Sequence, residues 1–405
     1  MENRLPAEVL AFLRRVAAIS GEEGFPLFLV GGVVRDLVLD ETNLDLDLVV
    51  EGDAMLLAQR LGEKLGGMAV AHRQFGTAKF LTGKQEVDIA TARTETYARP
   101  GALPIVRPGS IDEDLGRRDF TINAMAVALS PSSFGDLHDP FRGKADLRAG
   151  LVRVLHDRSF IDDATRILRA IRYEQRFGFR LEAHTEQLLH SCLSMLKTVS
   201  GDRVRHEIER ALNERQPELV LARMSGLGIL QEIDLSLTWD DWLQEKFVAA
   251  RDCGRASPRV FLALWLQRVP GPDLDRVTRY LGLPSSTSRV VRDAQAIQSS
   301  TPALAQGGLL PSHFVKLLGG HVEEALWTCY LATDSAIIKE RLLLYVERLR
   351  LVKPLLDGRR LMELGVKPGP HVGELLRLLR DARLDGTVKT EEDEVVLVRK
   401  SIVEG

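Results

Sequence analysis

Two aspartates stand close together in a segment where apolar and acidic residues alternate, Leu44-Asp45-Leu46-Asp47-Leu48-Val49-Val50. Alternation with a period of two predicts a β-strand whose three leucines face the core, so that Asp45 and Asp47 both point from the open face. Two carboxylates this close repel each other unless a cation lies between them. Oxygen ligands on a rigid strand suit Mg²⁺, and paired metal ions promote in-line phosphoryl transfer. We therefore expect Asp45 and Asp47 to bind metal and to be catalytic, although most such pairs in proteins are solvated surface acids.

A glycine turn precedes the acidic pair, in Leu29-Val30-Gly31-Gly32-Val33-Val34-Arg35-Asp36. The pattern predicts a strand, a turn and the start of a helix. Glycines let the backbone approach a phosphate closely, and a helix N-terminus offers N–H donors and the positive end of its dipole. Arg35, one turn into the helix, can add a charged fork to a triphosphate. Gly31, Gly32 and Arg35 are therefore expected to bind a nucleotide close to the metal.

Two further segments carry side chains that suit the same chemistry. Asp88 lies on another alternating segment, Glu86-Val87-Asp88-Ile89, and is expected to complete the metal site or to orient the attacking hydroxyl, with a solvated strand acid as the equal alternative. The segment Arg117-Arg118-Asp119-Phe120-Thr121-Ile122-Asn123-Ala124 offers two arginines for phosphates. Within it, Asp119 can accept a hydrogen bond from a ribose hydroxyl, and Asn123, one helical turn on, shares that face.

The elements that must hold these residues divide the chain into two kinds of structure. Up to about Leu129, short apolar segments and glycine turns alternate with helical patterns, which predicts a compact mixed α/β unit. The stretch 97–109 interrupts this unit, and its Gly and Pro content predicts a loop, either a mobile element beside the site or an ordinary connector. From Asp162 onward the periodic segments are helical. Helices are expected over 6–19, 54–65 and 162–177, and strands over 26–30, 68–72, 78–81 and 86–90.

The bulk composition is that of an ordinary globular protein with more than one domain. The chain has 405 residues, of which 45% are hydrophobic and 27% charged. Its net charge of −3 excludes a globally basic nucleic-acid binder but allows a local basic face. The three cysteines show no CxxC pairing, so neither a zinc site nor a disulfide framework is expected. With no signal peptide and no apolar run of about 18 residues, we expect a cytoplasmic protein that makes no membrane contact.

The order and spacing of Gly-Gly-x-Val-Arg-Asp, Asp-x-Asp and Arg-Arg-Asp-Phe-Thr-Ile-Asn-Ala resemble those of the class II tRNA nucleotidyltransferases and bacterial poly(A) polymerases. The resemblance implies the polymerase-β-like nucleotidyltransferase fold, an α+β head with a small mixed sheet, followed by an all-α neck, body and tail. It also places Asp36 and Arg118 among the nucleotide ligands. The implied bounds are 1–140 for the catalytic head, 141–215 for the nucleotide-selecting and RNA-binding neck, 216–350 for the body and 351–405 for the tRNA-binding tail.

The family has a Glu-Asp-x-x-Arg element whose side chains act as a protein template for the incoming base. The matching residues here are Asp162-Asp163-Ala164-Thr165-Arg166. On one helix, Asp163 and Arg166 share a face, where a carboxylate acceptor beside a guanidinium donor can read the Watson–Crick edge of a base. An ordinary salt bridge between them is the alternative. Asp162 departs from the family's Glu and is one methylene shorter, which alters the geometry around the template.

Basic residues after the template suit an RNA backbone. The segment 141–215 holds 15 Lys and Arg against 11 Asp and Glu, although a solvated helix face would explain the same excess. From the basic stripe on the predicted helix, Arg169 is expected to contact the nucleotide, and Arg172 and Arg176 to contact RNA. In the tail, Lys367 is expected to hold a tRNA phosphate, with a plain capped helix as the alternative reading of that segment.

The resemblance implies an enzyme that extends the 3′ end of tRNA with Mg²⁺ as cofactor, using ATP and, as a second candidate, CTP. Four activities stay open: addition of CCA, of CC only, of the terminal A only, and untemplated poly(A) addition. The loop 94–109 looks full length, and its Tyr-x-x-Pro-Gly-Ala-Leu-Pro sequence resembles that of relatives that add only the terminal A. CCA or A addition is therefore favoured. A catalytically silent RNA-binding protein is the alternative from another class, against which the expected metal acids argue. The sequence leaves the oligomeric state open.

Overall fold

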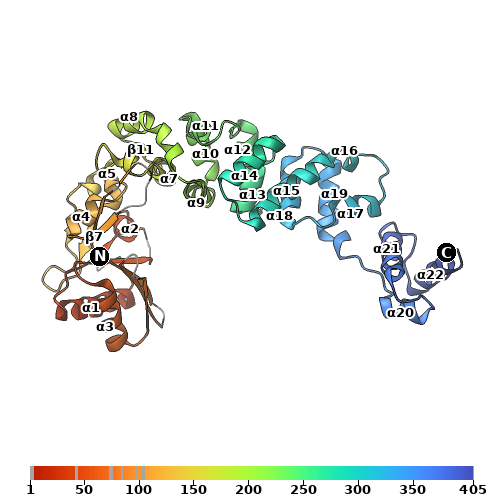
Figure 1. Cartoon of the computed structure of the whole chain (residues 1–405), viewed down its shortest axis with the longest axis horizontal. Helices are drawn as coiled ribbons and strands as arrows, with labels where there is room; N and C mark the ends of the chain where they lie inside the picture. Colours follow the sequence, from red (N-terminus) through yellow and green to blue (C-terminus); the bar gives the residue numbers. More distant parts are fainter. Residues whose placement is uncertain are drawn as a thin grey trace. The chain divides into compact units, whose positions relative to one another are not determined.

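The structure is a computed structural model that describes residues 4–41, 44–72, 76–83, 85–96, 98–99, 101 and 105–404. The chain forms two compact units, 1–235 and 236–405 (Figure 1). In the described part of the chain, all strands lie in the first unit. The finer division into head, neck, body and tail stays a prediction.

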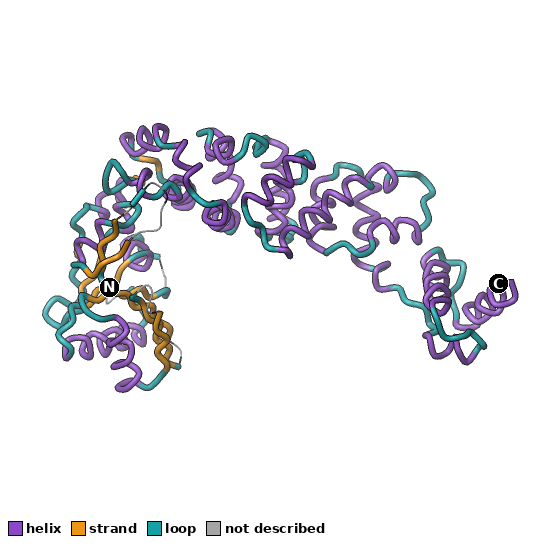
Figure 2. Tube along the Cα trace, viewed as in Figure 1, coloured by secondary structure: helices purple, strands orange, loops and turns teal. Residues whose placement is uncertain are grey.

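A mixed sheet of seven strands forms the framework of the first unit (Figure 2). β2 and β5 are parallel neighbours, and the other adjacent pairs are antiparallel. Across the sheet the strands are β3 (Met68–His72), β4 (Thr77–Thr82), β5 (Gln85–Thr91), β2 (Leu46–Val50), β1 (Leu27–Val30), β8 (Ala126–Ala128) and β9 (Leu137–His138). The helices of this region are α1 (Ala7–Glu22), α2 (Gly32–Val38) and α3 (Ala54–Leu65).

Helices α1 and α3 cover one face of the sheet (Figure 1). The Phe12 ring on α1 stacks on Phe80 of β4 with centroids 6.5 Å apart, and Leu57 of α3 is fully buried. Phe80 of β4 pairs with Val87 of β5, which pairs with Leu46 of β2, so these apolar residues lie on one face of the sheet. Asp47 and Asp88 have the opposite phase of the alternation and therefore lie on the other face. The sheet therefore has the buried and open faces that the alternating pattern predicts.

The strand that carries Asp47 begins later than the sequence predicted. Leu44 was expected on the buried face, but β2 begins at Leu46 and Leu44 is 52% exposed. The pairing of β2 with β5 starts at Leu46, so Leu44 has no neighbouring strand within the described residues against which to pack. The other strands and helices expected in the head are confirmed, with ends that differ by a few residues.

The stretch expected to be a loop also contains a hairpin. Strands β6 (Arg93–Thr96) and β7 (Ile105–Pro108) pair antiparallel, with Thr94 opposite Arg107. Both strands are short, β6 is mostly half-buried and β7 is exposed, and neither shows an apolar alternation that could have revealed it. Between them, Tyr97, Pro100 and 102–104 lie outside the described residues.

The single helix expected over 162–177 is two helices, α6 (Ser159–Asp162) and α7 (Thr165–Phe177). Asp163 lies between them in an extended conformation, with φ −144° and ψ 100°. Its Oδ1 accepts hydrogen bonds from the Thr165 backbone N–H at 3.0 Å and the Thr165 hydroxyl at 2.7 Å. The Asp163 side chain thus binds Thr165, the first residue of α7, while its extended backbone separates the two helices and interrupts the helix that the periodicity predicted.

The rest of the first unit is mostly helical. A short parallel pair joins β10 (Leu151–Val152) to β11 (Arg180–Leu181). The helices are α4 (Ile111–Gly116), η2 (Thr121–Asn123), α5 (Gly143–Ala149), α8 (Ala183–Ser191), η3 (Leu193–Thr198), α9 (Gly201–Leu212), α10 (Pro217–Gly226) and α11 (Ile229–Ile233).

The second unit is helical throughout its described residues, as expected. Phe247 and Phe261 stack in its core with centroids 4.6 Å apart, beside the fully buried Trp265. Its last helices enclose a separate apolar cluster that includes Leu361 and Leu379. Its helices are α12 (Asp241–Asp252), α13 (Pro258–Leu266), α14 (Gly271–Tyr280), α15 (Ser285–Ser299), α16 (Thr301–Leu304), α17 (Pro311–Leu318), α18 (Glu323–Ala332), α19 (Ala336–Glu347), η4 (Leu349–Leu351), α20 (Gly358–Glu363), α21 (Pro370–Leu384) and α22 (Glu391–Glu404).

Two expectations about the whole chain can be compared with the structure. Cys192, Cys253 and Cys329 are free thiols in the structure. Among the described helices, none combines the length and the apolar character needed to cross a membrane.

Candidate active site

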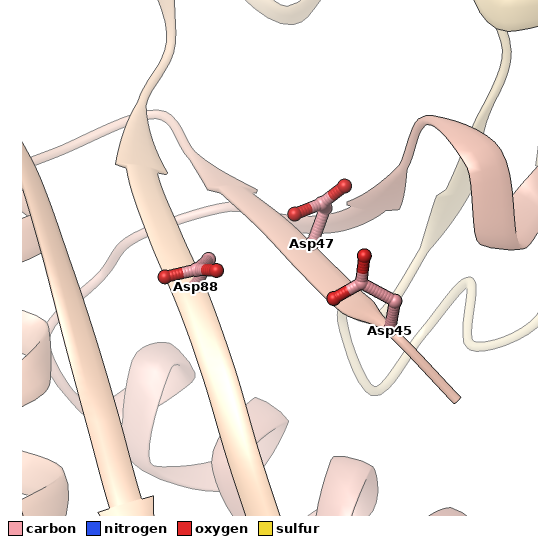
Figure 3. A group of neighbouring side chains, drawn as sticks. All are labelled: Asp45, Asp47 and Asp88. Carbon is pink, nitrogen blue, oxygen red and sulfur yellow. The ribbon is translucent and has the colours of Figure 1, made fainter. Parts of the chain in front are cut away.

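Three carboxylates meet on the open face of the sheet, side by side in Figure 3. Asp47 lies opposite Asp88 in the parallel register of β2 and β5, and Asp45 comes one residue before β2. One oxygen of each carboxylate lies within 4.8 Å of the others. The structure therefore brings together all three acids that the alternating segments pointed to.

The cluster concentrates negative charge, and this affects the ionisation of Asp47. Burial, and then the neighbouring Asp45 carboxylate, raise the pKa of Asp47 to about 6, while Arg118 opposes the rise. Lys79 on β4 balances part of the charge, with its Nζ 3.5 Å from Oδ1 of Asp88. Three carboxylate oxygens gathered in this way fit a divalent cation, which binds oxygen ligands and would relieve their repulsion.

The glycine turn passes directly beside the acidic cluster. Gly31 has a φ of +77°, a conformation that favours glycine. A Cβ at this position would lie 3.3 Å from Oδ2 of Asp47 and 3.5 Å from Nη1 of Arg118. A side chain at position 31 would therefore crowd the carboxylate, and glycine keeps the space beside it open. Gly32 follows as the first residue of α2.

Arg35, expected to hold a triphosphate, is buried and already has partners. Its Nε donates to Oδ1 of Asp36 at 2.8 Å, and its Nη1 donates to Oδ1 of Asn123 at 2.8 Å. Its guanidinium also lies over the rings of Tyr173 and Phe177, at 5.6 and 4.7 Å from their centroids. These contacts suit a residue that orients Asn123, and direct binding of the nucleotide by Arg35 and Asp36 stays a prediction.

Asp119 is the centre of a buried hydrogen-bond network. Its Oδ1 accepts from the Phe120 backbone N–H at 2.8 Å and from the Asn123 amide at 3.0 Å, and its Oδ2 accepts from Nε and Nη2 of Arg169 at 2.9 and 2.5 Å. Burial alone would raise the pKa of Asp119, but Arg169 and Asn123 lower it below its ordinary value. Four bonds occupy the acceptor positions of the carboxylate, so a ribose hydroxyl would have to displace one of them.

Arg117 and Arg118 are both anchored by a residue that the sequence did not single out. Asp114 is fully buried and accepts from Nη2 of Arg117 at 2.6 Å and from Nη2 of Arg118 at 3.0 Å. The Nε of Arg118 is buried, and none of the described residues accepts a hydrogen bond from it. Because Arg118 also lies beside Gly31 and Asp47, it keeps a donor near the acidic cluster.

The expected template pair is present, but its members do not bind each other. Oδ2 of Asp163 accepts from Nη2 of Arg203 at 2.8 Å. Arg166 is buried, and it donates to the Ser159 hydroxyl and to the Arg117 carbonyl, both at 2.7 Å. The alternative of a simple salt bridge between Asp163 and Arg166 is therefore not what the structure contains.

One cavity of about 950 Å³ connects these groups. A second cavity of about 940 Å³ shares Asp45, Asp47 and Arg176 with the first and extends past Arg172 to Arg215. The sequence reasoning missed the contribution of α9, whose polar residues recur at helical spacing and so could have been found. The first cavity is lined by Gly31, Gly32, Arg35, Asp45, Asp47, Glu95, Arg117, Arg118, Asp119, Asn123, Asp163, Thr165, Arg166, Arg169, Tyr173, Arg176, Arg203, His206, Glu207 and Arg210.

Comparison with known proteins agrees with this arrangement of residues. Residues 27–153 match the family described as poly A polymerase head domain, and 178–235 match the probable RNA and SrmB-binding site of polymerase A. The chain is 33% identical to an A-adding tRNA nucleotidyltransferase of Halalkalibacterium halodurans over 99% of this chain and 94% of that protein. The chain belongs to the tRNA nucleotidyltransferase family.

Solved structures of the family support the same assignment. A Thermotoga maritima CCA-adding enzyme complexed with tRNA is 32% identical and superimposes with a TM-score of 0.78 over 98% of this chain and 97% of that one. A CCA-adding enzyme in complex with ATP is also 32% identical, with a TM-score of 0.81 over 99% of this chain and 97% of that one. The chain is therefore an enzyme of the nucleotidyltransferase class, with the head and helical remainder that the sequence predicted.

The two family models leave α7 of this tRNA nucleotidyltransferase between them, so neither covers Asp163 or Arg166. Of the residues expected to contact RNA, Arg172 is buried, and its Nη1 donates to Glu214 at 3.0 Å. Arg176 is more exposed and lines both cavities. Lys367 is exposed in the second unit, before α21. The roles of these three residues in binding RNA stay predictions.

Proposed function

We propose that this tRNA nucleotidyltransferase adds the terminal adenosine of the tRNA 3′ end from ATP. The observation that carries the proposal is that Asp45 and Asp47 of the acidic cluster line the same cavity as Asp163 and Arg166, which would join a site for phosphoryl transfer to a site that can read a base. The A-adding relative, which aligns over almost the whole of both chains, favours adenosine. Addition of the complete CCA, with CTP as a further substrate, is the second candidate, because solved structures of similar identity are CCA-adding enzymes.

The acidic cluster would hold the catalytic metal, and we propose Mg²⁺ because the ligands are hard carboxylate oxygens. When bound, Mg²⁺ supplies positive charge to the reacting phosphate. In the reaction, the 3′-hydroxyl oxygen of the RNA forms a bond with the α-phosphorus, and the bond from that phosphorus to the β-phosphate bridge oxygen breaks, releasing pyrophosphate. Asp88, which is exposed on the strand beside Asp47, would accept the hydroxyl proton or act as a further metal ligand.

The rest of the cavity would bind and orient the nucleotide. The space left by Gly31 and the guanidinium of Arg118 beside it suit the triphosphate. Arg169, held by Asp119, and Asn123, held by Arg35, present their remaining donors to the sugar. Because both partners are buried and fixed before substrate binds, little reorganisation is needed when the nucleotide arrives.

Asp163 and Arg166 would then select the base. A carboxylate oxygen accepts from the exocyclic amino group that adenine and cytosine share, and a guanidinium N–H can donate to the neighbouring ring nitrogen. Arg172 and Arg176, with Arg215 beyond them, would guide the 3′ strand of the RNA toward the cluster through the second cavity. Nucleotide addition to tRNA ends takes place in the compartment where tRNA is made, so we also propose a cytoplasmic location.

The test uses purified protein and three forms of one tRNA, ending before CCA, after C and after CC, each offered labelled ATP or CTP. The proposal expects ATP incorporation only on the CC end, one residue per molecule. Incorporation of CTP on the two shorter ends followed by ATP would assign CCA addition, and CTP alone would assign CC addition. Runs of A on any end would assign poly(A) addition. A preparation of the Asp45→Asn variant excludes activity from contaminating enzymes.

A further inference from the structure

The Asp163 carboxylate is held from two sides by residues of different segments. Thr165, at the start of α7, donates to Oδ1 through both its backbone N–H and its hydroxyl. Arg203, in the first turn of α9, donates to Oδ2 from 2.8 Å. The side chains of Asp163 and Arg203 are 20% and 29% exposed, and both line the cavity of about 950 Å³. The orientation of this carboxylate therefore depends on α9 as well as on its own chain segment.

The number of acceptor positions on the Asp163 carboxylate determines what the contact with Arg203 does. An ionised carboxylate has about four lone-pair positions. Both positions of Oδ1 are used by Thr165, and Arg203 uses one of those on Oδ2. One acceptor position of Oδ2 is left, and its direction is set by the bond to Arg203. Without Arg203 the carboxylate can rotate about its bonds to Thr165, so the remaining lone pair loses its fixed direction.

The other member of the pair is fixed independently. Arg166 is held by the Ser159 hydroxyl and the Arg117 carbonyl, two neutral acceptors, and neither contact involves α9. A base that enters the cavity would thus meet a guanidinium oriented by one set of contacts and a carboxylate oriented by another. Loss of Arg203 should disturb only the carboxylate.

We propose that Arg203 is a positioning residue that fixes Asp163 and thereby enforces the choice of adenine or cytosine over uracil. Adenine and cytosine present an amino donor on their Watson–Crick edge, whereas uracil presents a carbonyl oxygen that a fixed carboxylate repels. A carboxylate free to rotate would accept uracil more readily. This inference rests on the proposed function, because it deepens the selection of the base by the same cavity.

The experiment compares kcat/KM for ATP and for UTP on the tRNA end that wild-type protein extends, in wild type and in Arg203→Ala. We expect the ratio of ATP to UTP to fall by about tenfold or more, the range set by losing one hydrogen bond to a charged group. Arg203→Lys keeps the charge without the planar fork and should restore part of the ratio. Arg205→Ala is the matched control, since Arg205 lies on the same helix but pairs with Asp202 and Glu209.

A double-mutant comparison separates positioning from a general loss of structure. Asp163→Asn should lower the ratio by itself, and adding Arg203→Ala should then change it little, because both act through one carboxylate. Equal further loss in the double variant would overturn the inference, as would an unchanged ratio in Arg203→Ala. If the melting temperature shows that Arg203→Ala does not fold, the ratio of ATP to UTP is measured in Arg203→Gln instead, and an unchanged ratio in that variant overturns the inference. Wild-type protein that extends no tRNA end would refute the proposed function and this inference with it, whereas wild-type extension with an unaffected ratio would refute the inference alone.

Discussion

Asp47→Asn should stabilise the metal-free protein at neutral pH, although it removes a carboxylate expected to bind metal. Burial and the nearby Asp45 raise the pKa of Asp47 from 3.8 to about 6, so the folded chain holds this proton more tightly than the unfolded chain does. Folding stability is therefore lost as the pH rises from below 3.8 through about 6. An asparagine carries no charge at any of these pH values, so the variant escapes that loss.

The size of the effect follows from the pKa difference and from the exposure of the group. A rise from 3.8 to about 6 corresponds to about 3 kcal/mol if it is fully expressed. Asp47 is only half-buried, and Arg118 and Lys79 lie near it, so we expect about 1–2 kcal/mol at neutral pH. In a unit of the size of 1–235, this corresponds to a rise in melting temperature of roughly 2–8 °C.

The assay is thermal unfolding in a chelator at several pH values, repeated with Mg²⁺. The difference in melting temperature between Asp47→Asn and wild type should be small in mild acid and should grow toward neutral pH. Adding Mg²⁺ should raise the melting temperature of wild type and not that of the variant, because only wild type keeps the complete ligand set. Glu86→Gln serves as control, since Glu86 pairs with Lys79 on β4 but is not part of the acidic cluster. A lower melting temperature for Asp47→Asn at neutral pH in chelator, or an equal response of both proteins to Mg²⁺, would refute the reasoning.

Three other predictions concern the same cavity, and a fourth concerns residues 98–107. Asp45→Asn should reduce nucleotide transfer to background while tRNA binding, measured by filter retention, stays close to wild type; transfer that persists with Mg²⁺ would contradict the metal assignment. Arg166→Ala should change the ratio of ATP to CTP incorporation more than their total, and an unchanged ratio would exclude a role in reading the base. Arg169→Ala leaves the buried Asp119 anion without its cation, so urea unfolding should show a loss of about 3 kcal/mol, and adding Asp119→Asn should recover part of it. Replacing 98–107 by a short glycine linker should impair A addition selectively, and equal loss of every step would indicate a folding defect instead.

The sequence predicted those parts of the site that depend on local pattern. The alternation around Asp47 and Asp88 placed both carboxylates on the open face of a sheet, and the two strands proved to be parallel neighbours in matching register. That pairing is a property of the topology, and no local pattern states it. Gly31 was likewise predicted from the turn, because a positive φ has a recognisable residue preference.

The parts that the sequence could not supply are those decided by competition between contacts. Periodicity continued a helix through Asp163, whereas a hydrogen bond from Thr165 and an ion pair with Arg203 hold this residue outside α7. Arg35 was expected to face a phosphate, but its guanidinium binds Asp36, the next residue in the chain, and Asn123, which is distant in sequence and is brought to it by the fold. The charged residues therefore predicted which positions belong to the site. They did not predict whether each side chain touches the ligand or holds another residue that touches it.

This distinction explains why the cavity contains so many arginines in a chain whose net charge is negative. Several of them bind a carboxylate that lies behind them: Asp114 holds Arg117 and Arg118, and Asp119 holds Arg169. Each such pair fixes one edge of a guanidinium and compensates part of its charge, which lowers the cost of burying it before any substrate is present. The remaining Nη1 of Arg117 donates to Glu95 at 2.7 Å and that of Arg169 lies 3.6 Å from Glu207, so the orientation of each guanidinium is set before any substrate binds. Acids therefore occur in two arrangements around this site: the carboxylates of the acidic cluster lie close enough together to fit a cation, whereas those behind the arginines already hold a cationic side chain.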